Sequence, residues 1–117
     1  MFDLTRFDLA MFEASATRAA GLLRLLGNEK RLMVLCQLAD GELSVGQLQA
    51  RIGLSQSALS QHLALLREQG VVATRREGQT IHYRISDPAA LRVIATLAEL
   101  FCPDGPGQPA ASVLQGE

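Results

Sequence analysis

Apolar residues recur at helical spacing through the first third of the chain. The stretch from about Asp8 to Leu26 is rich in Ala, Leu and Arg and contains no proline, a composition that favours a helix. Gly27 and Asn28 interrupt this stretch, and the Asn28 side chain can cap a second helix that runs to about Ala39. The apolar stripe of the second helix, at positions i, i+3, i+4 and i+7, comprises Leu32, Leu35, Cys36 and Ala39.

The next part of the chain has the layout of a helix-turn-helix. Ser44 can cap a short third helix, VGQLQARIG, which stops at Gly53. Ser55 can cap a fourth helix over residues 56–70, closed by Gly70. In this fourth helix we expect a buried stripe of Leu59, Leu63 and Leu66, and a polar leading end of Gln56, Ser57, Ser60 and Gln61.

A hairpin and a last helix complete the expected elements. In VVATRREGQTIHYRIS, apolar and polar residues alternate on both sides of a turn at residues 77–79, which predicts two antiparallel strands. Asp87 and Pro88 suit the start of a last helix, which the Pro-Gly-rich segment from residue 103 stops. We therefore predict one domain over residues 1–103 and a disordered tail over residues 104–117. The apolar positions of the last helix are Leu91, Ile94, Ala98, Phe101 and Cys102.

Composition changes this picture at one place. The 117 residues carry a net charge of −1, yet five arginines lie between Arg51 and Arg84 against only Glu68 and Glu77. A basic middle in a near-neutral chain is typical of a local nucleic-acid footprint. No apolar run approaches the ~18 residues that span a bilayer, and acidic residues interrupt the first segment where a secretory signal would be apolar. We expect a cytoplasmic protein with no membrane partner.

The helix-turn-helix and the basic hairpin together indicate binding to double-stranded DNA. Polar side chains at the leading end of a recognition helix can reach base edges in the major groove, and arginines of a wing can contact phosphate or the minor groove. The alternative is a solvated polar face on an ordinary helical domain. The candidate DNA contacts are Ser55, Gln56, Ser57, Ser60, Gln61, His62 and Arg67 of the fourth helix, and Arg75, Arg76 and Gln79 of the hairpin.

Catalytic and metal chemistry find little support in the residues. The chain has no Gly-rich phosphate loop, no H-E-x-x-H and no nucleophile elbow. His62 and His82 each lack a partner at metal-ligand spacing, although a metal role for either stays open. We expect neither an enzyme nor a bound cofactor or metal.

The two cysteines leave two interpretations open. Cys36 lies on the inward stripe of the second helix and suits a small core residue, while Cys102 lies at the last turn of the last helix. A reducing cytoplasm argues against a permanent disulfide, so any pairing would be transient. Position alone does not decide whether the two sulfur atoms meet.

The order of elements and two segments, LGNEKRLMVLCQL and GELSVGQLQARIGLSQSALSQHLALLREQGVVATRREGQTIHYRI, resemble the ArsR/SmtB-type winged-helix repressors over about residues 10–102. The resemblance implies a mainly α winged helix-turn-helix of about five helices with a β-hairpin wing. Metal sensors of this family carry a cysteine where this chain has Ser44. A second family metal site retains Asp87 here, but its other positions are Ala89, Leu100 and Pro103.

One non-metal branch, the BigR/SqrR-type group, is similar in placing one cysteine in the second helix and one at the end of the last, as Cys36 and Cys102 are placed here. The resemblance implies a repressor that senses persulfide or polysulfide and releases DNA when a disulfide or polysulfide bridge joins the two cysteines. With the first and last helices as the dimer interface, two recognition helices over residues 55–69 would enter major grooves about 34 Å apart and read a pseudo-palindromic operator. The alternatives are a metal-responsive or general redox-responsive repressor, or a constitutive DNA-binding protein.

Overall fold

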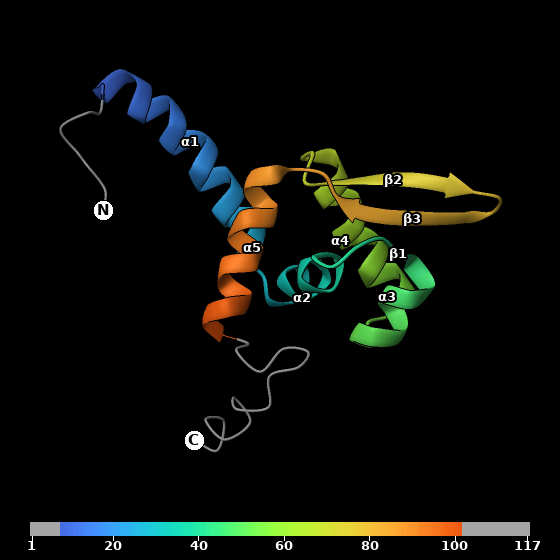
Figure 1. Cartoon of the computed structure of the whole chain (residues 1–117). Helices are drawn as coiled ribbons and strands as arrows, with labels where there is room; N and C mark the ends of the chain where they lie inside the picture. Colours follow the sequence, from blue (N-terminus) through green and yellow to red (C-terminus); the bar gives the residue numbers. More distant parts are fainter. Residues whose placement is uncertain (1–7, 102–117) are drawn as a thin grey trace, which may run out of the picture.

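The computed structural model of the protein describes residues 8–101 (Figure 1). In this part of the chain, five helices enclose one hydrophobic core, and a three-stranded antiparallel sheet lies at its side. The expectations for Cys102 and for the tail after residue 103 lie outside the described residues. The elements are α1 Leu9–Leu26, α2 Glu29–Leu38, β1 Leu43–Ser44, α3 Val45–Ile52, α4 Gln56–Glu68, β2 Val72–Glu77, β3 Thr80–Ile85 and α5 Pro88–Phe101.

Local chemistry explains where the helices of the helix-turn-helix begin and end. Ser44 caps α3 through a reciprocal box, because its Oγ accepts from the Gln47 backbone N–H at 3.2 Å while the Gln47 side chain accepts from the Ser44 N–H at 2.9 Å. Gly53 ends α3 in the left-handed region, at φ 80°, which a residue with a Cβ adopts only with strain. Ser55 then caps α4. The predicted helix-turn-helix is confirmed.

The sheet contains one strand more than the sequence analysis predicts. Its order is β1-β3-β2, and the short β1 pairs Leu43 with Tyr83 and Ser44 with His82. The hairpin turn is also shorter than expected, because Glu77 belongs to β2 and pairs with Thr80. The turn is therefore Gly78-Gln79, and Gly78 has the positive φ of 64° that the first position of a tight type II′ turn requires.

The core is built from leucine stripes. Leu59, Leu63 and Leu66 of α4 are buried as predicted, and Leu25 and Leu26 at the end of α1 pack into the same cluster. A buried Leu side chain contributes about 1.5–3 kcal/mol relative to an exposed one, so these stripes fix how the helices pack.

The apolar positions of α5 divide between the core and the surface. Ala90 and Ile94 are fully buried, whereas Leu91 is 39% exposed and Phe101 is 75% exposed. The helix packs on α2 and β3. The exposed apolar residues of α5 remain outside the core of the single chain.

Helix α1 and the β2–β3 hairpin extend from opposite sides of the molecule (Figure 1). Only the last turn of α1 enters the core, and residues 9–19 are exposed along their whole length. Among the described helices, none is both long and apolar enough to cross a bilayer.

Candidate nucleic-acid interface

The leading end of α4 presents a row of exposed polar side chains. Gln56, Ser57, Ser60 and Gln61 are all exposed, while the opposite stripe of leucines anchors the helix in the core. The leucine anchor leaves the polar side chains pointing to solvent. Amide and hydroxyl groups in this arrangement can donate to and accept from base edges or phosphate oxygens.

Three other predicted contacts on α4 differ in their surroundings. Ser55 is exposed, but its Oγ is engaged as the helix cap and accepts from the Ala58 N–H at 3.1 Å. Arg67 is exposed in the last turn, far along the helix from the polar leading end. His62 is partly buried, and its pKa is lowered first by burial and then by the positive charge of Arg31. His62 thus favours its neutral form.

The hairpin tip carries Arg76 and Gln79, both exposed. Arg76 Nε donates to the Gly78 carbonyl at 3.1 Å, so the guanidinium lies over the turn. Only one nitrogen of that guanidinium is used by this bond, and the group can still present donors to a phosphate. The β2–β3 hairpin, residues 72–85, is called the wing below.

Arg75, one residue earlier, has a different environment. Its Nε and Nη2 donate to both carboxylate oxygens of Glu42, at distances between 2.8 and 3.2 Å. Its Nη1 lies 3.5 Å from the carboxylate of Glu77. Hydrogen bonding by Arg75 lowers the pKa of Glu42 and in turn raises the pKa of Arg75, so both groups stay charged. The sequence analysis named Arg75 but missed Glu42, because the two residues are 33 positions apart.

The sensing candidate within the described residues is Cys36. It is only partly buried, although it packs against the core beside Leu32 and Ala39 as its stripe predicts. Its helix, α2, packs against α5, whose last residue is Phe101. In residues 8–101, no group of three or more His, Cys, Asp or Glu side chains lies close enough together to hold a metal ion.

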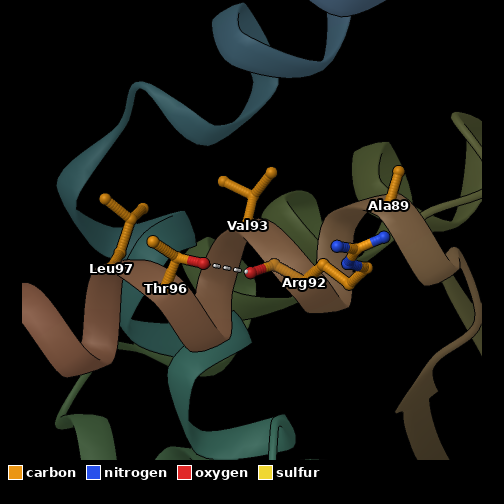
Figure 2. A pocket seen from close by; sticks show the side chains of 5 residues that line it. All are labelled: Ala89, Arg92, Val93, Thr96 and Leu97. Atoms are coloured by element: carbon orange, nitrogen blue, oxygen red, sulfur yellow. Dashed lines mark hydrogen bonds between the residues drawn. The ribbon is translucent and has the colours of Figure 1, made fainter. Parts of the chain in front are cut away.

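The outer face of α5 is hollowed. Ala89, Val93 and Leu97 follow one another along one side of the helix, and Thr96 Oγ1 donates to the Arg92 carbonyl at 2.9 Å (Figure 2). Together these residues line a shallow hollow of about 430 Å³. A second hollow of about 550 Å³ lies between α5 and the middle of α1, and it shares Ala89 and Val93 with the first. The two hollows form a continuous surface, called the α1–α5 face below.

Comparisons with known proteins agree with this geometry. Residues 28–74 match the profile of the family described as bacterial regulatory protein, arsR family. The transcriptional activator HlyU of Vibrio cholerae is 48% identical over 95 residues, covering 81% of this chain and 88% of that protein. The solved structure of reduced HlyU matches with a TM-score of 0.76 over 79% of this chain and 97% of that chain, at 49% identity.

Two repressors are similarly close. The biofilm growth-associated repressor of Agrobacterium fabrum is 45% identical over 100 residues, which cover 86% of each protein. The crystal structure of the transcriptional repressor BigR from Xylella fastidiosa matches with a TM-score of 0.76 at 40% identity, covering 84% of this chain and 97% of that chain. The winged helix-turn-helix and these identities identify a DNA-binding transcriptional regulator rather than an enzyme, and the chain belongs to the bacterial ArsR family.

Proposed function

We propose that this regulator is a cytoplasmic, homodimeric repressor that binds a pseudo-palindromic operator and releases it when reactive sulfur species join Cys36 to Cys102. The observation that carries operator binding is the polar leading end of α4, exposed on a helix whose other side is locked into the core. Gln56, Ser57, Ser60 and Gln61 read bases or position the helix on phosphates. Arg76 and Gln79 at the wing tip contact the backbone or the minor groove.

The α1–α5 face supports the dimer. Exposed apolar residues gather on α1, among them Leu9, Met11 and Leu23, and at the end of α5. Surface of this kind is costly to leave in water, and a second copy of the same chain would bury it symmetrically. A dimer joined here would present two α4 helices to successive major grooves about 34 Å apart.

A charge at an exposed apolar position of α1 tests the dimer. Leu23→Glu should give a monomer in sedimentation analysis, because a carboxylate would be buried without a partner in the interface. Leu23 is exposed in the single chain, so the helix content should not change. Ala64→Glu adds the same charge to an exposed position of α4 and should remain dimeric. A dimeric Leu23→Glu protein would contradict the proposed interface.

The position of the cysteines supports the sensing step. Cys36 lies on α2, α2 packs against α5, and Cys102 follows Phe101 directly in the sequence. Cys36 is only partly buried, and a reactive thiol needs partial exposure of this kind. A bond between these two cysteines would tie α2, which precedes the helix-turn-helix, to a helix of the α1–α5 face.

The chemistry balances with persulfide as the oxidant. One cysteine thiolate attacks the outer sulfur of an organic persulfide RS–SH, which forms Cys–S–SH and releases RSH. The second thiolate attacks the inner sulfur of this cysteine persulfide, forms the Cys–S–S–Cys bond and expels hydrogen sulfide. The two cysteines lose two electrons, which reduce the persulfide to RSH and hydrogen sulfide. A second equivalent of persulfide adds one sulfur atom to the bridge.

The test measures DNA binding and mass on the same sample. Reduced protein first selects its operator from randomised duplexes, and glutathione persulfide should then lower the affinity for that operator together with a mass change at the cysteines. Cys36→Ser and Cys102→Ser should bind the operator and resist release. Release of both variants by persulfide would contradict the pair, while release by a stoichiometric metal would favour a metal sensor. Release by peroxide as effective as by persulfide would favour a general redox sensor, and unchanged binding in every case would favour a constitutive DNA-binding protein.

A further inference from the structure

Three consecutive residues, Glu42, Leu43 and Ser44, join the wing to the helix-turn-helix. The Glu42 side chain binds Arg75 on β2, the backbone of residues 43 and 44 pairs with β3, and the Ser44 side chain caps α3. Each residue thus fixes a different element, and together they hold both wing strands against the start of α3. This segment therefore connects the wing to the helix-turn-helix in addition to the packing of β2 against α4.

Arg75 points its guanidinium at carboxylates with all three of its nitrogen atoms. Two of them bind Glu42 in a bidentate pair, and the third faces Glu77. Planar two-point pairing of this kind fixes direction as well as distance. Glu77 also lies 3.4 Å from His82 Nε2, which stands opposite Arg75 on β3. A phosphate that approached Arg75 would therefore meet two carboxylates as well.

Arg76 has the opposite surroundings. It is the next residue, so its side chain points to the other face of the strand. There it donates to a backbone carbonyl, and within residues 8–101 it forms no ion pair with a carboxylate. Two neighbouring arginines of one strand thus have different electrostatic settings. The charge of Arg75 is balanced by neighbouring carboxylates and its side chain is held in place, whereas the charge of Arg76 near the tip is not balanced in this way.

We propose that Glu42 and Arg75 are positioning residues: their ion pair sets the angle of the wing, and Arg75 makes no contact with operator phosphate. The inference rests on the operator binding proposed above, and it assigns positioning to Arg75 and phosphate contact to Arg76. The exposed side-chain fractions, 29% for Glu42 and 47% for Arg75, place the pair between core and solvent. The pair links β2 to the segment that starts α3, and it stays intact when the protein binds DNA.

The sign of the Glu42 effect separates this role from the alternative. If Glu42 merely held Arg75 until a phosphate replaced it, Glu42→Ala would remove a competing charge and tighten operator binding. If the pair positions the wing, Glu42→Ala should weaken operator binding about three- to fivefold, as expected for the loss of one ordered surface pair. Tighter binding, or unchanged binding, would overturn the proposal.

Salt dependence separates Arg75 from Arg76. Each arginine that neutralises a phosphate contributes about 0.9 to the slope of log affinity against log salt concentration. Arg76→Ala should lower that slope by about this amount, whereas Arg75→Ala should weaken binding about three- to fivefold and leave the slope unchanged. The charge-reversed pair Glu42→Arg with Arg75→Glu, made together with Glu77→Gln so that the new carboxylate meets no like charge, should bind within about twofold of the Glu77→Gln protein, because the pair is restored. A reduced slope for Arg75→Ala, or no recovery in the reversed pair, would overturn the proposal.

A measurement without DNA keeps the inference separate from operator binding. In the free protein, Glu42→Ala should speed amide hydrogen exchange in residues 43–44 and in β3, because one of the three attachments of the wing is lost. Exchange in α5 serves as the internal control and should not change. Unchanged exchange in β1 and β3 would overturn the positioning role, even if the protein bound its operator. A chain that selected no operator while showing faster exchange would instead refute the operator binding alone.

Discussion

Two glycines of α3 should respond in opposite directions to the same substitution. Gly53 ends the helix at φ 80° and ψ 18°, and a Cβ added there would meet no atom within 4 Å. Gly53→Ala therefore introduces no clash, and its cost is the strain of the left-handed backbone, about 1–2 kcal/mol. Gly46 lies inside the first turn of α3, where a Cβ would lie 3.9 Å from Ser44 Oγ, an ordinary contact. Gly46→Ala should stabilise the fold by about 0.5 kcal/mol, because alanine loses less backbone entropy in a helix.

Urea unfolding followed by circular dichroism measures both effects. With a slope of about 1–3 kcal/mol per M, Gly53→Ala should lower the midpoint by about 0.3–2 M, and Gly46→Ala should raise it slightly. Since both changes add one methyl group to the same short helix, differences in hydrophobicity cancel. Equal shifts of the two variants, or an unchanged midpoint for Gly53→Ala, would refute the assignment of the turn to a left-handed glycine.

Two further predictions concern α4. Leu63→Ala should destabilise the fold by about 2–5 kcal/mol, measured as a lower urea midpoint, because Leu63 is 1% exposed. Ser60→Ala should change stability by less than about 0.5 kcal/mol, but it should weaken operator binding in a gel-shift titration. In the folded protein the pKa of His62 lies below its ordinary 6.5. Between the folded pKa and 6.5 the unfolded chain therefore binds more protons than the folded chain. The contribution of His62 to the free energy of unfolding is complete above this window and falls as pH decreases through it. His62→Gln should therefore flatten the loss of urea midpoint between about pH 7.5 and about pH 5.5, and equal slopes for both proteins would refute this role.

The helix-turn-helix is predictable from the sequence because its signals are local. Ser44, Gly53 and Ser55 each act on backbone groups within four residues, and the leucine stripe of α4 repeats at the helical period. Gln47, three residues after Ser44, completes a capping box, which is also a local signal. The polar leading end of α4 follows directly from where the leucines point.

The parts that sequence reasoning missed depend on residues far apart in the chain. β1 has only two residues, too few for an alternating pattern, and it exists because β3 lies beside it. The partner of Arg75 is Glu42, and no spacing rule connects positions 33 residues apart. The division of α5 between buried Ile94 and exposed Leu91 has the same origin, since packing on α2 and β3 selects the buried face.

Because the first half of α1 is exposed, the concentration of the protein should affect how fast it is degraded. An isolated helix of this length is marginally stable in water, and the side chains of residues 9–19 are exposed in the single chain. A single copy would fray there and offer its backbone to proteases, whereas a copy paired through the α1–α5 face would be protected. A cell would then remove unpaired regulator faster than paired regulator, so its repression would switch more steeply with the rate of synthesis than simple dimerisation provides.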